Sequence, residues 1–219
     1  MARKLARTGL ARRGVARIGA LLVLMAAAAL APVRAEPAKG ATDTVERLHA
    51  ALITVMREAD SMDYAARRAL IAPVIESGFD SAFMARVAAG SYWRGMSEAE
   101  QAALIAQFRA FTIANYAARF NGYSGERFET VAETALAGNR EMVRTQLVRT
   151  KRDPVSLDYV LRQSGADWVI IDIFMNGTVS ELATRRAEFA PILRDQGAAG
   201  LIASLAAKTA DLAGESGAP

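Results

Sequence analysis

The chain repeats apolar residues with the spacing of α-helices from residue 42 to about residue 121. Apolar side chains recur every three or four positions, which places them on one face of each helix. The helices predicted in this way cover about 42–59, 63–76, 80–89 and 97–121. Thr42 or Asp43 is suited to cap the first helix, and Pro73 is expected to kink or shorten the second.

The longest of these helices, at 97–121, carries more apolar bulk than a surface helix needs. Ser97 and Glu100 have the spacing of a capping box at its start, and Asn121-Gly122 suits a left-handed cap at its end. Its large apolar side chains are Leu104, Phe108, Phe111, Ile113, Tyr116 and Phe120. The pattern predicts a helix with a broad buried face.

After Gly125 the pattern changes to alternation, which is typical of β-strands. The predicted strands cover about 126–136, 140–151, 155–163 and 168–175. Turns at Asp153-Pro154 and Gly165-Ala166-Asp167 join successive strands, and such short connections favour an antiparallel meander. The third strand has a single apolar face made of Val155, Leu157, Tyr159 and Leu161.

The strand at 168–175 is apolar on both faces apart from Asp172, so we expect it to be covered on both sides. Two further helices are predicted at 178–195 and 198–213. The elements together indicate the α+β class, with a four-stranded antiparallel sheet packed against N-terminal and C-terminal helices. We expect a single domain over 36–213, with helices in 42–121, strands in 126–175 and helices in 178–213, followed by a tail at 214–219.

The first 35 residues have the composition of a secretory signal peptide. A basic stretch precedes an apolar run from Ile18 to Leu30, and Val33-Arg34-Ala35 provides a cleavage site. The run of about 13 apolar residues is shorter than the roughly 20 that a membrane-spanning helix needs. No cysteine follows the run, which excludes a lipoprotein anchor. We therefore expect export and cleavage after Ala35.

Removing this segment changes the net charge. The whole chain has 27 basic and 23 acidic residues, and seven of the basic residues but no acidic residue lie in 1–35. The remaining 20 basic and 23 acidic residues give a net charge of −3. This value offers no support for binding nucleic acid. Because the chain has no cysteine, its core rather than disulfides must stabilise it.

Residues suited to catalysis or metal binding are scarce. His49 is the single histidine and cysteine is absent, which excludes the usual zinc clusters and a cysteine nucleophile. The sequence has no phosphate loop, dinucleotide-binding motif or G-x-S-x-G motif. We expect His49 to be partly buried and structural. Asp172 is the strongest candidate acid or base, although an ion pair or a helix cap is the commoner role. No cofactor or metal is expected.

Several short motifs together resemble one known family. They are Phe79-Asp80, Phe83-Met84, Tyr92-Trp93-Arg94, Tyr123-Ser124-Gly125-Glu126, Tyr159-x-Leu161 and Trp168-x-Ile170-x-Asp172. In this order they resemble the MlaC, or toluene-tolerance, family of periplasmic phospholipid-binding proteins. The likeness covers about 42–210 and is strongest to the hopanoid-associated HpnM branch. It implies an NTF2-like fold of the MlaC type.

The resemblance also implies a function. Members of this family shuttle lipid between the two membranes of Gram-negative bacteria, so the implied cargo is phospholipid, or hopanoid in the HpnM branch. The implied partners are an inner-membrane lipid transporter, either an MCE-type ABC complex or an RND-type exporter, and an outer-membrane lipoprotein complex. We expect a monomer in the periplasm, with lipid as cargo and no nucleic-acid partner.

A lipid carrier needs a dry cavity, on the order of 1,000 Å³ for a diacyl lipid. Each buried methylene is worth about 0.8 kcal/mol, so one 16-carbon chain is worth roughly 12 kcal/mol. The resemblance implies a lipid cavity, and the candidate residues for its wall are Phe108, Phe111, Tyr116, Val143, Leu147, Leu157, Tyr159, Leu161, Val169, Ile171 and Ile173. The sequence alone does not distinguish such a cavity from a packed core. Arg185-Arg186 can bind a lipid phosphate or form a solvated helix face.

Two other functions stay open at this point. The first is an enzyme on a cone-shaped α+β scaffold, in which Asp172 and a tyrosine transfer protons. A polar cleft around Asp172, open to solvent, would favour it. The second is a periplasmic adaptor without cargo, which a tightly filled core would favour.

Overall fold

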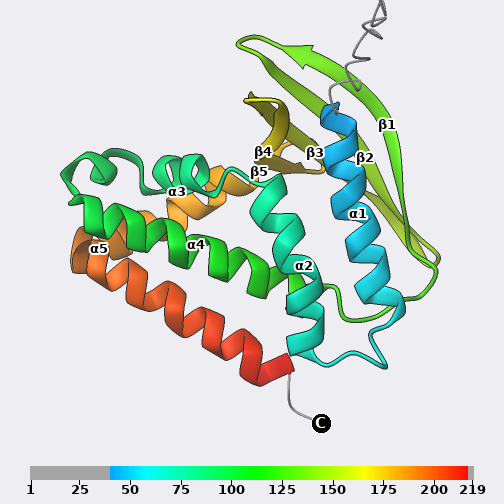
Figure 1. Cartoon of the computed structure of the whole chain (residues 1–219), viewed down its shortest axis with the longest axis horizontal. Helices are drawn as coiled ribbons and strands as arrows, with labels where there is room; N and C mark the ends of the chain where they lie inside the picture. Colours follow the sequence, from blue (N-terminus) through cyan, green and yellow to red (C-terminus); the bar gives the residue numbers. More distant parts are fainter. Residues whose placement is uncertain (1–39, 217–219) are drawn as a thin grey trace, which may run out of the picture. The chain divides into compact units, whose positions relative to one another are not determined.

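The structure is a computed structural model that describes residues 40–216, and the predicted signal peptide lies outside them (Figure 1). The helices are α1 (Ala41–Arg57), α2 (Tyr64–Gly78), α3 (Ser81–Ala89), the 3-10 helix η1 (Gly90–Gly95), α4 (Glu98–Arg119) and α5 (Glu181–Ser216). The strands are β1 (Arg127–Leu136), β2 (Arg140–Arg149), β3 (Arg152–Ser164), β4 (Asp167–Met175) and β5 (Val179–Ser180). The predicted α+β class is confirmed.

Short-range capping sets several helix starts. The Ser97 N–H donates to Glu100 Oε2 at 2.9 Å and the Glu100 N–H donates to Ser97 Oγ at 3.3 Å, so the predicted capping box is confirmed. The start of α1 differs from the prediction. Gly40 is the N-cap, and its N–H donates to Asp43 Oδ2 at 2.9 Å. The hydroxyl of Thr42 instead bonds to a carboxylate on β1.

The helix ends follow the predictions only in part. Pro73 lies inside α2 without ending it. The predicted left-handed cap after α4 is wrong, because neither Asn121 nor Gly122 has a positive φ. The predicted break between the last two helices is confirmed. Gly197, with φ 67° and ψ −168°, divides α5 into two helical segments, and glycine tolerates this backbone conformation best.

The strands form one sheet in the order β1-β2-β3-β4-β5, with every neighbouring pair antiparallel. β5 adds two residues to the predicted four strands, and the turn expected at Asp153-Pro154 lies at Thr150-Lys151. A bulge interrupts β4. Val160 pairs with Asp172 and Leu161 pairs with Ile170, which leaves Ile171 as an extra residue. This bulge changes which side chains of β4 share a face.

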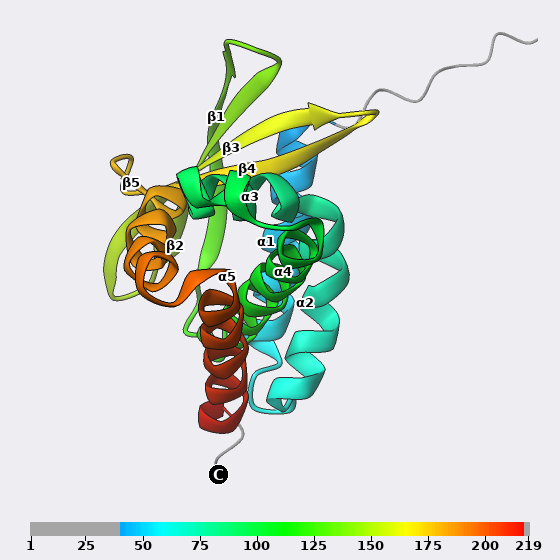
Figure 2. The same cartoon turned by 90° about the vertical axis from the view of Figure 1, so that its left-hand side faces the viewer.

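The core lies between the sheet and the helices. α1 packs against β1 to β4, and α4 lies beside the second segment of α5 in both views (Figures 1 and 2). The largest fully buried side chains include Leu48, Leu52, Ile71, Ile75, Leu104, Tyr159, Leu161, Ile170, Leu201 and Leu205. Burying each leucine or isoleucine is worth roughly 2 kcal/mol. No helix within residues 40–216 has the length and hydrophobicity that crossing a bilayer requires.

Candidate functional site

A cavity of about 460 Å³ opens between one end of the sheet, the C-terminal half of α4 and the start of α5. Its apolar lining consists of Phe111, Tyr116, Phe120, Leu147, Val155, Leu157, Tyr159, Ile173, Met175 and Val179. Its polar lining consists of Asn115, Arg119, Glu181, Thr184, Arg185 and Glu188. The volume is that of an ordinary ligand pocket, about 300–1,000 Å³, and is smaller than the size expected for a diacyl lipid.

The wall brings together several residues that the sequence analysis selected. They are Phe111, Tyr116, Leu147, Leu157, Tyr159 and Ile173. Leu157 and Tyr159 share a face of β3, as the alternation predicted, and Ile173 of the neighbouring strand β4 pairs directly with Tyr159. Phe120, Val155, Met175 and Val179 also line the cavity but were not among the predicted site residues. Phe120 and Met175 stand at the end of an element, where periodicity gives the weakest signal.

Phe108 and Val143 do not line this cavity. Val143 is fully buried and Phe108 nearly so. The ring of Phe108 meets Phe189 of α5 edge-to-face, with 6.3 Å between the ring centroids. Such aromatic packing between two helices closes the space instead of leaving it open. Both residues therefore belong to the packed core.

Leu161 also belongs to the core, although it shares a face of β3 with Leu157. It is fully buried and pairs with Ile170 of β4. Phe79, at the end of α2, forms a bridge to Ile170 and covers this end of the sheet. The cavity lies at the other end, where Leu157 is only half-buried. One strand face is therefore core at one end and cavity wall at the other.

Val169 and Ile171 lie on the opposite face of the sheet from Ile173. Ile171 faces a second hollow, which it lines with Val160 and other residues of the outer face. Arg162 follows Leu161 on β3, so its side chain lies on the outer face of the sheet. Val169 pairs with Arg162, and paired residues of adjacent strands share a face, so Val169 also lies on the outer face. The prediction placed Val169, Ile171 and Ile173 on one face, which holds only for a regular strand. The bulge at Ile171 adds an extra residue to β4 and therefore places Val169 and Ile171 on the face opposite to Ile173.

The second hollow, of about 440 Å³, lies between the outer face of the sheet and α3. Its lining consists of Phe83, Val87, Leu136, Ala137, Arg140, Met142, Val160, Ile171, Asp172, Phe174 and Leu182. Ile171 on this face and Ile173 on the inner face are only 5% and 7% exposed. The prediction that this strand is covered on both sides is thus confirmed.

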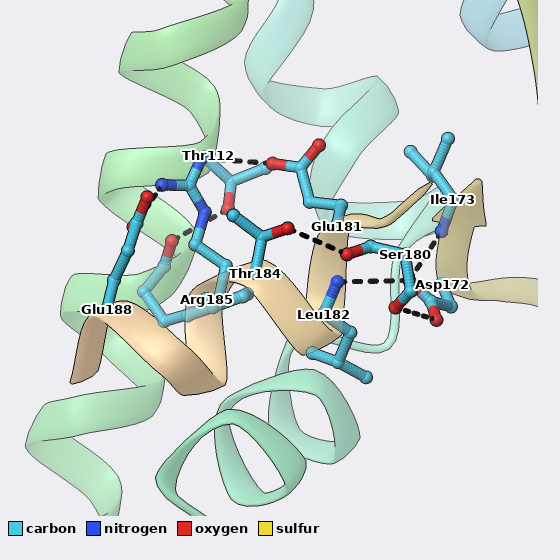
Figure 3. A network of polar contacts seen from close by, with 10 residues as sticks. Thr112, Asp172, Ile173, Ser180, Glu181, Leu182, Thr184, Arg185 and Glu188 are labelled. Carbon is cyan, nitrogen blue, oxygen red and sulfur yellow. Dashed lines mark hydrogen bonds and ion pairs between the residues drawn. The ribbon is translucent and has the colours of Figure 1, made fainter. Parts of the chain in front are cut away.

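Asp172 caps the start of α5 (Figure 3). Its Oδ1 accepts from the backbone N–H of Ile173 at 2.8 Å and of Leu182 at 3.1 Å, and its Oδ2 accepts from the Ser180 hydroxyl at 2.7 Å. Both carboxylate oxygens therefore hold β4, β5 and α5 together. The predicted alternative of a helix cap is confirmed, and these contacts give the acid–base alternative no support.

A buried histidine orients one tyrosine of the cavity wall. His49 Nε2 lies 3.0 Å from the hydroxyl of Tyr159, and the imidazole stacks on Phe128 with 3.9 Å between ring centroids and an interplanar angle of 7°. His49 is 6% exposed, so its predicted burial is confirmed. Burial lowers the pKa of His49 to about 3, which keeps the ring neutral at ordinary pH. This contact could not be predicted from a local pattern, because the two residues are 110 positions apart.

The buried imidazole predicts a loss of stability in acid. Unfolded His49 takes up a proton near pH 6.5, but folded His49 does so only near pH 3, so lowering the pH between these values favours the unfolded chain. Each pH unit by which the pH falls in this window lowers the free energy of unfolding by about 1.4 kcal/mol. The loss between pH 6.5 and 5 is about 2 kcal/mol. Urea unfolding of the wild type and His49→Gln across this range measures the difference. Parallel stability curves for the two proteins would contradict the prediction.

Charged groups surround the mouth of the cavity. The Arg185 guanidinium forms ion pairs of 3.0 Å with both Glu181 and Glu188 along the first turns of α5 (Figure 3). The same guanidinium lies 5.0 Å from the ring centroid of Phe111. Arg119, in the last turn of α4, is exposed at the mouth. The site therefore has an apolar interior and a charged rim.

The site has no visible set of metal ligands. Among the side chains of residues 40–214, no three of histidine, cysteine, aspartate or glutamate are grouped as a metal ion would require. The sheet, the helices and the cavity together define an α+β protein with an apolar pocket whose mouth is polar. A pocket with this lining can enclose an amphiphilic molecule, with the apolar part of that molecule inside and its charged part at the rim.

Comparisons with known proteins identify the family. The chain belongs to the MlaC family, whose model, described as MlaC protein, matches residues 46–207. The solved structure of a phospholipid-binding protein from Ralstonia solanacearum, in complex with a phospholipid, has a similar fold. Its TM-score is 0.68 at 21% sequence identity, covering 81% of this chain and 99% of that chain. The family and the MlaC-type fold predicted from the sequence are therefore confirmed.

Proposed function

We propose that this protein is a periplasmic lipid carrier that encloses the acyl chains of a phospholipid in the cavity between the sheet, α4 and α5. The observation that carries the proposal is the cavity itself, an apolar pocket that ends in a charged rim, within a chain of the MlaC family. A phospholipid has the same division into apolar tails and a charged head. The Ralstonia solanacearum protein of similar fold was solved in complex with a phospholipid.

The energetics of transfer favour such a cavity. Each methylene removed from water is worth about 0.8 kcal/mol, so a carrier must shield most of both acyl chains while it crosses an aqueous compartment. Side chains such as Phe111, Leu157 and Ile173 offer the apolar surface for this shielding. No covalent chemistry is required. The carrier only has to release its cargo when a membrane or a partner offers an equally apolar surface.

Two acyl chains need more room than about 460 Å³. The first segment of α5, which carries Glu181 and Arg185, forms one wall of the cavity. We propose that the cavity widens as the second chain enters.

We propose that residues 1–35 are a signal peptide cleaved after Ala35 and that 36–213 form a single lipid-binding domain. Membership of the MlaC family supports a periplasmic location. We propose that the protein exchanges lipid with an inner-membrane transporter of the MCE or RND type and with an outer-membrane lipoprotein complex. Hopanoid is the alternative cargo. The cavity counts against a cargo-free adaptor, since that function needs no such space.

Transfer between vesicles tests carriage. Residues 36–219 are mixed with donor vesicles that contain a fluorescent phospholipid and with acceptor vesicles that lack it. Transfer should rise in proportion to protein concentration, because each molecule carries its cargo through water. A rate equal to that of protein-free vesicles, with an intact circular dichroism spectrum, would contradict the proposal. A parallel assay with labelled hopanoid shows which cargo is preferred.

A further inference from the structure

The mouth of the cavity carries opposite charges on its two sides. On the α5 side, two carboxylates, those of Glu181 and Glu188, share the single guanidinium of Arg185, which leaves one net negative charge. On the α4 side stands Arg119, and no carboxylate oxygen of residues 40–214 lies within 4.0 Å of its guanidinium. The rim is therefore neutral as a whole but positive on one side and negative on the other.

Arg119, Glu181, Arg185 and Glu188 line one opening, and Tyr116 lies in its wall. Burial raises the pKa of Tyr116 well above its ordinary value, and Tyr159 and Glu181 raise it further, whereas Arg119 and Arg185 oppose the rise. Charges that act on one phenol from both α4 and α5 lie close to the same point. The other polar groups of the rim, on Asn115 and Thr184, carry no charge.

We propose that this rim is a headgroup subsite that selects zwitterionic phospholipids. Arg119 binds the phosphate of the lipid, and Glu188 binds its ammonium group. Glu188 is the more exposed of the two carboxylates, with 41% of its side chain accessible against 30% for Glu181. The inference rests on the proposed function, because the headgroup reaches the rim only when the tails fill the cavity.

An anionic headgroup fits the same rim less well. Phosphatidylglycerol offers a phosphate to Arg119, but it has no ammonium group to place beside Glu181 and Glu188. Its net negative charge is not balanced by a neutral rim. Exposed ion pairs are weak and are screened by salt, so we expect a preference of about threefold for phosphatidylethanolamine at low ionic strength.

Competition between two lipids with identical chains tests the subsite. Residues 36–219 are incubated with vesicles that contain equal amounts of dioleoyl phosphatidylethanolamine and dioleoyl phosphatidylglycerol, then separated and extracted. Mass spectrometry gives the ratio of the two bound lipids. Glu188→Gln makes the rim net positive and should lower the ratio from about three to about one or below. Arg119→Gln makes it net negative and should raise the ratio while reducing the total lipid bound.

Matched variants control for the change in protein charge. Glu76→Gln on α2 and Arg109→Gln on α4 alter exposed residues outside the cavity wall and should leave the ratio unchanged. If Glu188→Gln and Arg119→Gln shift the ratio no further than these controls, or in the same direction, the subsite is overturned while the carrier function stands. If the wild type takes up no lipid at all, the proposed function itself fails.

Discussion

Leu161→Asp is expected to destabilise the protein strongly at neutral pH. Leu161 is fully buried, and its partner on β2 is Glu141, so an aspartate there would be a buried charge facing another carboxylate. An uncompensated buried charge costs about 3–5 kcal/mol, a large part of the 5–15 kcal/mol that stabilises an ordinary domain. We expect the midpoint of thermal unfolding to fall by about 10 °C or more, as circular dichroism would measure.

Leu161→Met serves as the control, because it keeps the apolar character and nearly the volume of the side chain. This substitution should lower the free energy of unfolding by less than about 1.5 kcal/mol. If Leu161→Asp instead folded with an unfolding midpoint close to that of the wild type, the space around residue 161 would be open to water. That result would extend the cavity to the far end of β3 and contradict its assignment to the core.

Leu157→Asp is expected to have the opposite effect, with the fold preserved and the lipid lost. Leu157 lies four residues earlier on the same strand face, but it is half-buried and lines the cavity. Its carboxylate can keep water around it once the cavity is free of lipid, so the cost to folding is small. In the presence of acyl chains the same charge would have to lose its water, which strongly opposes lipid binding.

Two measurements separate these effects for Leu157→Asp. Thermal unfolding should stay within a few degrees of the wild type, and organic extraction should recover little or no lipid. Leu157→Met, which keeps the wall apolar, should retain lipid. A folded Leu157→Asp protein with wild-type lipid content would show that the cargo does not occupy this cavity.

Much of the fold follows from interactions close in sequence. The capping box of Ser97 and Glu100 and the break at Gly197 depend on a few neighbouring residues, so the sequence predicts them well. The alternation in β3 correctly placed Leu157 and Tyr159 on one face. Such periodic signals report which side of an element is buried. They carry no information on what lies against that side.

The site was harder to predict because its residues are defined by distant contacts. Leu157 and Leu161 have the same residue type on the same strand face, and they differ only in what covers them. The bulge at Ile171 arises from the pairing between β3 and β4. It places the side chains of Val169 and Ile171 on the face of the sheet opposite to Ile173. Neither contact leaves a mark on the local pattern, so the sequence predicted the cavity wall only in part.

The lipid content of the wild-type protein tests the central claim most directly. The exported protein is purified without detergent from a Gram-negative host and examined by native mass spectrometry, with organic extraction of the same sample. We predict the mass of the mature chain plus that of a phospholipid, together with the same phospholipid in the extract. A protein that shows only the mass of the unliganded chain, under conditions that preserve non-covalent complexes, and that yields no lipid would contradict the account.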